Sequence, residues 1–181
     1  CTASSRARMT LALHGGGAWS PREVGMKEMT RKKTVTREAD AGRSPFRPDL
    51  LVWMDGELVA WEDANVHVMA HVLHYGSSIF EGVRCYKTPR GPAIFRLREH
   101  VRRLYDSARI YRMEIGIEDD AFAQAMCATV RANKFESCYL RPLVYRGLGT
   151  PGVNPLGSPV RSAIVCWDWG AYLGDHSAVT G

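Results

Sequence analysis

The sequence has 181 residues, 45% of them hydrophobic and 24% charged, and a formal net charge of +5. This length suits one well-buried domain with a short appendage, and the composition excludes a disordered or fibrous protein. No apolar run reaches the roughly 18 residues that a membrane-spanning helix needs, so we expect a soluble protein.

The positive charge is concentrated at the N-terminus. Residues 1–48 carry ten lysines and arginines against four acidic residues, whereas acids slightly outnumber bases in the remainder. We therefore interpret residues 1–48 as a basic, largely disordered extension, and expect the rest to have no general attraction for nucleic acid. Because the sequence starts with Cys1, we expect it to be incomplete at this end or to include translated upstream sequence; an organelle-targeting segment is the alternative.

The ordered part is expected to begin with short strands. The segment LLVWMDGELV, residues 50–59, is typical of two strands joined by Asp55-Gly56, a turn whose residues tolerate positive φ. Residues 66–74 have helical or loop character, and a strand over roughly 79–87 follows. A turn at TPRG then leads into a short strand at 93–95.

Two helices and two long strands complete the pattern. Apolar residues three to four apart predict a helix over 96–113 with a buried stripe of Leu97, Val101, Leu104, Ala108 and Tyr111. A second helix is expected over roughly 119–133, with an inward face of Phe122, Ala125, Met126, Thr129 and Val130. Strands at 137–147 and 161–169 flank a Gly/Pro-rich loop at 148–159. This order predicts an α+β domain whose mostly antiparallel sheet carries two helices on one face.

The cysteines and histidines do not predict a metal site. The five cysteines are scattered without a Cys-x-x-Cys pair, which argues against a disulfide scaffold or thiolate metal site and for a reducing, cytoplasmic location. His67, His71 and His74 have the spacing of one helical face, but no carboxylate or cysteine completes a ligand set. We interpret them as local hydrogen-bonding groups near a turn and expect no metal.

The segment HYGSSIFEGVRCY, residues 74–86, is unusual for a strand that only fills a core. It spaces aromatic and charged residues around Gly76 and Gly82, a pattern that suggests a lined pocket. The alternative, which composition alone favours, is a half-buried strand with Gly82 at a bulge.

Two arginines are candidates for anion binding. Arg103, on the first predicted helix, can form two hydrogen bonds to a phosphate or carboxylate, but the residues alone do not distinguish this role from that of a solvated helix arginine. Arg141 lies in the apolar strand segment SCYLRPLVY, where a charge needs a partner or a ligand. Tyr139 and Arg141 share a strand face by the period-two rule, and together they can recognise a carboxylate.

Five segments together resemble a known family. They read WMDGELVAWEDANVHVMAHVLHYGSSIFEGVRCY, GPAIFRLREHVRRLYDSARIYRM, SCYLRPLVYRG, GVNPLG and WGAYLG. In this order and spacing, over about residues 48–174, they closely resemble the N-terminal domain of branched-chain amino acid aminotransferases, pyridoxal-phosphate enzymes of the D-alanine aminotransferase-like fold class. The resemblance implies a small domain at residues 49–160, followed at 161–181 by an interdomain strand and the start of a second domain.

The resemblance implies a transaminase that moves the amino group of leucine, isoleucine or valine to 2-oxoglutarate, with pyridoxal 5'-phosphate as the electron sink. By motif, Arg103 in HVRRL resembles the arginine that grips the cofactor phosphate. Phe80 in SSIFEG, with Trp169 and Tyr172 in WGAYLG, resembles the apolar wall that accepts a branched side chain.

The remaining site residues are also assigned by resemblance. Tyr139 and Arg141 resemble the pair near the substrate carboxylate, and Arg84 resembles a further arginine at the entrance. Tyr75 and Val153 resemble residues lent to the neighbouring subunit's pocket, which implies a homodimer or a larger homo-oligomer.

The resemblance also predicts what this chain lacks. In the family the lysine that carries the cofactor lies in the second domain, beyond the position of Gly181, and no lysine of this sequence has an equivalent context. We therefore expect the 181-residue chain alone to be inactive. Its last residues, DHSAVTG, depart from the continuation expected for the family, which indicates a truncated or frameshifted product or an incomplete gene model.

Two alternatives remain open. One is another member of the fold class, a D-amino acid aminotransferase or an aminodeoxychorismate lyase, against which the WGAYLG and GVNP matches argue. The other is a non-catalytic protein whose basic extension contacts nucleic acid or a membrane surface. The family assignment requires the guanidinium of Arg103 to face the same cavity as the rings of Phe80, Trp169 and Tyr172.

Overall fold

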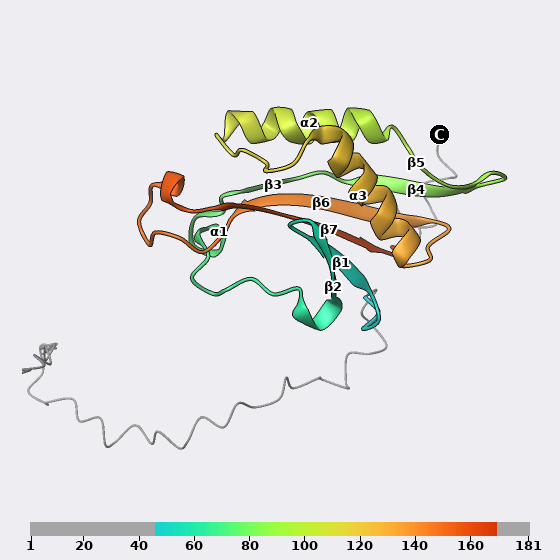
Figure 1. Ribbon diagram of the computed structural model, residues 1–181, viewed down its shortest axis with the longest axis horizontal. Coiled ribbons are helices and arrows are strands. Elements are labelled where there is room, and N and C mark those ends of the chain that lie inside the picture. The colour runs from blue at the N-terminus through green and yellow to red at the C-terminus, as the bar shows by residue number, and fades with distance from the viewer. Residues whose placement is uncertain (1–45, 170–181) are drawn as a thin grey trace, which may run out of the picture. The chain divides into compact units, whose positions relative to one another are not determined.

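A computed structural model describes residues 46–169 of the protein. In this range seven strands form one sheet, and two long helices cover one of its faces (Figure 1). The structure confirms the predicted α+β architecture. Tyr172 and residues 1–45, which include most of the predicted basic extension, lie outside the described residues. In the part that the structure describes, no helix has the length and apolar character to cross a membrane.

The strands lie in the order β2-β1-β7-β6-β4-β5, with β3 also paired to β6, and every pairing is antiparallel. The strands are β1 Leu51–Met54, β2 Glu57–Ala60, β3 Ser78–Phe80, β4 Val83–Thr88, β5 Gly91–Ile94, β6 Cys138–Arg146 and β7 Val160–Trp167. The α-helices are α1 His71–Tyr75, α2 Leu97–Ile110 and α3 Asp119–Ala132. Two single 3-10 turns are η2 Trp61–Asp63 and η3 Pro155–Gly157.

The β1–β2 hairpin forms where Asp55-Gly56 predicts it. Both turn residues have positive φ, +50° and +113°. The Asp55 carboxylate also ties the turn to β7, because it accepts a hydrogen bond from the Ser162 N–H at 2.8 Å and pairs with Arg161 Nε at 2.9 Å.

The strand predicted over 79–87 is not continuous. It forms β3 and β4, with Glu81 and Gly82 between them, and both pieces pair with β6. Between the pairs Phe80–Leu143 and Val83–Leu140, two residues lie on the β3–β4 side and two on β6. Gly82 therefore does not lie at a bulge. The residue opposite Glu81 is Pro142, which has no N–H to donate to the ladder, and this explains the interruption.

The helices α2 and α3 bury the faces that their apolar periodicity predicts. The core contains Val101 and Leu104 from α2 and Phe122 and Met126 from α3. Tyr111, predicted as part of the α2 stripe, is instead 58% exposed. The reason is that α2 ends at Ile110 and the chain then changes direction through a positive φ at Arg112.

Alternation along β6 separates the two faces of the sheet. Cys138, Leu140 and Val144 are buried in the core with the helices. Tyr139 and Arg141 alternate with these residues and therefore point to the opposite face, which we call the open face. The open face is thus the side of the sheet on which the sequence predicts substrate-binding groups.

Candidate functional site

Arg141 is surrounded by aromatic rings on the open face. Its Nη2 donates to the Tyr139 hydroxyl at 3.2 Å, which confirms that the two residues share a strand face. Its Cζ lies between 4.8 and 5.8 Å from four ring centroids, those of Phe80, Tyr139, Trp167 and Trp169. We call Arg141 and these four rings the ring cluster.

The ring cluster includes one residue that sequence reasoning missed, Trp167. The β6–β7 register places it opposite Tyr139, with the ring centroids 4.9 Å apart. The centroid of Trp169 lies 4.7 Å from that of Tyr139. Trp167 could have been predicted by pairing the strand at 137–147 with the strand at 161–169 in this register.

The guanidinium of Arg141 has no carboxylate partner among the described residues. Its Nε is buried and has no hydrogen-bond partner among them. Ring faces stabilise a cation without neutralising it. The arrangement can therefore bind a carboxylate at Arg141 while the rings, of which that of Phe80 is 58% exposed, contact an apolar group.

Arg84 lies beside the ring cluster. It is opposite Tyr139 in the β4–β6 pairing and therefore on the open face. Its guanidinium lies 5.9 Å from the ring centroid of Tyr86.

Gly82 gives the ring of Tyr139 its position. A Cβ atom at Gly82 would lie 2.4 Å from the Tyr139 hydroxyl oxygen, well inside van der Waals contact. The absence of a side chain at this position therefore lets the phenol lie against the backbone between β3 and β4 and reach Arg141.

Arg103 is engaged by a buried carboxylate. Its Nε donates to Glu81 Oε1 at 2.6 Å and its Nη2 to Glu81 Oε2 at 2.5 Å, while His100 Nδ1 lies 3.0 Å from the same Oε2. Burial by itself raises the pKa of Glu81, but the hydrogen bonds and charges of Arg103 and His100 outweigh it and hold that pKa below the usual value. Glu81 is therefore an ionised acceptor that fixes one edge of the Arg103 guanidinium.

Arg103 and the ring cluster lie on opposite faces of the sheet. Glu81 is buried toward α2, whereas the neighbouring residue Phe80 contributes its ring to the cluster on the open face. This placement contradicts the expectation that the Arg103 guanidinium faces the same cavity as the rings of Phe80 and Trp169, because Glu81 holds the guanidinium on the helix side of the sheet. The two groups are adjacent through the backbone of residues 80–82, at an edge where β3 has no strand partner other than β6 in the described range.

Tyr75 and Val153 are linked indirectly, through hydrogen bonds between α1 and the loop at 147–154. The Tyr75 hydroxyl donates to the Pro151 carbonyl at 3.3 Å, and His71 Nε2 lies 3.2 Å from the Val153 carbonyl oxygen. Both predicted side chains are solvent-exposed, Tyr75 by 46% and Val153 by 74%. Both side chains therefore point to solvent from α1 and from the loop at 147–154, which is hydrogen-bonded to α1.

The hydrogen bonds of His67 and His74 are local, as the sequence predicts, whereas His71 also bonds to the distant Val153, so the prediction of purely local bonds is wrong for His71. His67 Nδ1 accepts from the Met69 N–H at 3.0 Å, His71 bonds with Ser77 and Val153, and His74 Nε2 lies 3.0 Å from the Val68 carbonyl oxygen. Across residues 46–169, no three histidine, cysteine or acidic side chains are grouped as metal ligands would be.

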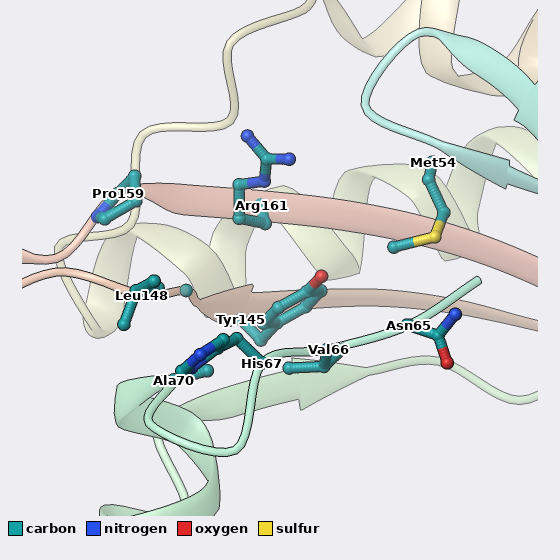
Figure 2. A pocket seen from close by; sticks show the side chains of 10 residues that line it. Met54, Asn65, Val66, His67, Ala70, Tyr145, Leu148, Pro159 and Arg161 are labelled. Carbon is teal, nitrogen blue, oxygen red and sulfur yellow. The ribbon is translucent and has the colours of Figure 1, made fainter. Parts of the chain in front are cut away.

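A cavity of about 310 Å³ lies elsewhere in the domain (Figure 2). Figure 2 shows Tyr145 on its strand between Arg161 and the segment that carries Val66 and His67. Burial and the charge of Asp55 raise the pKa of the Tyr145 phenol. None of the predicted site residues lines this cavity, and its walls come from four separate segments, so sequence patterns gave no signal for it.

A protein-family model described as "Amino-transferase class IV" matches residues 78–172. The branched-chain-amino-acid aminotransferase of Pseudomonas aeruginosa is 48% identical over 133 residues, which are 74% of this chain and 43% of that protein. The corresponding protein of Escherichia coli K12 is 47% identical over 131 residues, or 72% of this chain and 42% of that protein. The chain therefore spans less than half the length of these curated relatives.

Solved structures agree with the sequence matches. The crystal structure of the Escherichia coli branched-chain amino acid aminotransferase superposes with a TM-score of 0.68 at 48% identity, over 70% of this chain and 42% of that one. A structure of the T.th. branched-chain amino acid aminotransferase complexed with 4-methylvaleric acid gives a TM-score of 0.65 at 47% identity. The match covers 67% of this chain and 41% of that one. The same enzyme complexed with N-(5'-phosphopyridoxyl)-L-glutamate gives a TM-score of 0.66 at 48% identity, over 68% of this chain and 42% of that one.

Proposed function

The chain belongs to the class IV aminotransferase family, and we propose that its folded part is the N-terminal domain of a transaminase for leucine, isoleucine and valine with 2-oxoglutarate as acceptor. Because the chain spans about 42% of the relatives' length, the proposal concerns an enzyme of which this domain is one part. The scattered cysteines make a reducing, cytoplasmic location part of the same proposal.

The observation that carries the proposal is the ring cluster. A branched side chain needs an apolar wall, which the rings of Phe80 and Trp169 supply, and the side-chain carboxylate of glutamate needs a cation, which Arg141 supplies. Both groups lie on one face, so one pocket can accept both kinds of substrate. Tyr139 orients the guanidinium through its hydroxyl, and Arg84 lies opposite Tyr139 on the same face.

Arg103 fits the phosphate of pyridoxal phosphate. Its side chain is 64% exposed, and Glu81 occupies Nε and Nη2, so that Nη1 has no hydrogen-bond partner among the described residues. A guanidinium held at one edge and open at the other is suited to a phosphate oxygen. When bound, the cofactor supplies the electron sink of transamination; the relative from T.th. was solved with a phosphopyridoxyl compound. Arg103 would hold the phosphate of the cofactor, and the ring cluster, adjacent to it through the backbone of residues 80–82, would hold the substrate.

We assign Tyr75 and Val153 to the pocket of a second copy of the enzyme. Both are exposed and fixed to one another through α1 and its loop, and neither contributes to the ring cluster of its own domain. This arrangement supports a homodimer in which each protomer completes the other's substrate site.

The lysine that carries the cofactor is proposed to lie outside this domain. Of the lysines in the described range, Lys87 pairs with Glu136 at 2.6 Å on the surface, and Lys134 follows the end of α3. Neither belongs to the ring cluster or to the Arg103 group. We therefore expect the purified 181-residue chain, supplied with pyridoxal phosphate, valine and 2-oxoglutarate, to produce no glutamate.

The experiment that tests the function restores the remainder of the enzyme. Residues 1–169 are joined to the part of the Escherichia coli relative that follows its matched segment; we call this protein the joined enzyme. Expected is transfer from leucine, isoleucine and valine to 2-oxoglutarate. Preferential use of D-alanine, or release of pyruvate from aminodeoxychorismate, would assign the domain to another member of the fold class.

A further inference from the structure

Two side chains of α1 hydrogen-bond to the loop that carries Val153. His71 Nε2 lies 3.2 Å from the Val153 carbonyl oxygen, and the Tyr75 hydroxyl donates to the Pro151 carbonyl at 3.3 Å. Within the described part of the chain, these are the hydrogen bonds that connect residues 148–153 to anything outside the loop. Gly149 and Thr150 pack closely on Gly157 and Ser158 at the start of the loop, whereas Val153 is hydrogen-bonded to α1.

His71 is the buried member of this pair. It is 3% exposed, whereas Tyr75 is 46% exposed and Val153 74%. The backbone N–H of His71 also donates to the Gly147 carbonyl at 3.1 Å, where the loop begins. One residue thus contacts both the start of the loop and its far end, while the side chains of Tyr75 and Val153 remain free to meet another surface.

The hydrogen bonds of His71 define its tautomer. A carbonyl oxygen only accepts, so Nε2 carries the proton that is donated to Val153. Nδ1 then accepts from the Ser77 hydroxyl at 2.7 Å. Both ring nitrogens are satisfied, which fixes the ring, and the Tyr75 ring packs against it with centroids 4.5 Å apart.

We propose that His71 is a positioning residue for substrate recognition: its bond to the Val153 carbonyl sets where that side chain stands in the neighbouring subunit's pocket. This consequence for the substrate rests on the function proposed above. The hydrogen bond itself is a property of this chain and can be tested without catalysis.

Two amide variants distinguish the hydrogen bond between His71 and Val153 from the other contacts of the His71 side chain. His71→Gln places an amide nitrogen about as far out as Nε2 and can donate to Val153, whereas the shorter His71→Asn reaches only the region of Nδ1 and Ser77. Both remove the ring and its contact with Tyr75. His74→Asn is the matched control, because His74 lies on the same helix and its Nε2 is 3.0 Å from a different carbonyl, that of Val68.

The measurement is the backbone order parameter of residues 148–153 by NMR relaxation of the full 181-residue chain. We expect values near the rigid limit of about 0.85 in the parent, His74→Asn and His71→Gln proteins, and values toward about 0.6 in His71→Asn. Equal loop order in His71→Asn and His71→Gln, or loss of the folded spectrum in both, would overturn the proposal.

The kinetic consequence is measured in the joined enzyme. His71→Asn is expected to raise KM for leucine roughly 3- to 10-fold, the effect of one lost hydrogen bond, with kcat within about twofold, and His71→Gln restores KM. Equal KM values in the two variants contradict the positioning role. An inactive parent joined enzyme refutes the proposed function, while the order parameters still decide whether His71 holds the loop.

Discussion

Arg103 donates two hydrogen bonds to the carboxylate of Glu81, Nε to Oε1 at 2.6 Å and Nη2 to Oε2 at 2.5 Å. Glu81 is 7% exposed, so its charge is stabilised by these partners rather than by water. The pair joins α2 to the break between β3 and β4. It holds the proposed phosphate-binding residue next to the backbone that carries Phe80.

Removing the charge of Glu81 is expected to destabilise the domain. Glu81→Gln keeps the volume but weakens two charge-assisted hydrogen bonds, so the free energy of unfolding should fall by about 1.5–3 kcal/mol in urea denaturation. Glu99→Gln is the control, since Glu99 pairs with Arg96 at 3.6 Å on the surface and should change stability by less than about 1 kcal/mol. Equal losses in the free energy of unfolding would mean that the buried Glu81–Arg103 pair stabilises the domain no more than the surface pair does.

The Glu81 pair also predicts a pH dependence. The pKa of Glu81 is lowered in the folded protein, so the folded state favours the ionised carboxylate. Its contribution to stability is complete above the usual value of 4.5 and is lost as pH falls through the lower folded value. The stability difference between the parent and Glu81→Gln should therefore be constant near neutral pH and shrink in acid. A difference that grows on acidification contradicts the assignment.

A side chain at Gly82 is expected to displace Tyr139. Because the added Cβ would lie 2.4 Å from the hydroxyl oxygen, Gly82→Ala should push the phenol away from Arg141 and destabilise the domain by about 1–3 kcal/mol. Tryptophan fluorescence should also change, since Trp167 and Trp169 pack on Tyr139. Gly116→Ala is the control, with nothing within 4 Å of the added atom. An unaltered spectrum in Gly82→Ala would show that the close approach does not position the ring.

The thiols are expected to react in a fixed order. Burial, with the neighbouring Cys138, raises the pKa of Cys85 to about 11, and the hydrogen bond to Cys166 together with burial raises that of Cys138. Alkylation requires the thiolate and access to it. Among the four described cysteines, the partly exposed Cys127 should therefore be modified first by iodoacetamide, as read by peptide mass spectrometry. Modification of Cys85 ahead of Cys127 in native buffer would contradict the buried packing.

Local sequence signals predicted most of the fold. The Asp55-Gly56 turn, the two amphipathic helices and the long strands were all found by periodicity and turn chemistry, which depend on neighbouring residues. The break after Phe80 was missed because its cause, Pro142, lies opposite Glu81 on another strand.

The site was predicted less completely for the same physical reason. Tyr139 and Arg141 are two residues apart on one strand, so their common face follows from the strand period. The contact of Trp167 with Tyr139 depends on register, and the pairing of Glu81 with Arg103 depends on how α2 packs on the sheet. The roles of Arg103, Tyr75 and Val153 came from family resemblance and remain predictions.

The most direct test of the account is kcat/KM of the joined enzyme when Arg141 is replaced. With leucine and 2-oxoglutarate, Arg141→Leu should lower kcat/KM for 2-oxoglutarate by roughly 10- to 100-fold, because the substrate carboxylate loses a charged hydrogen-bond partner. Arg131→Leu, at the exposed end of α3, should leave it unchanged. An Arg141→Leu enzyme with the parent's kcat/KM would show that the ring cluster does not bind the substrate carboxylate.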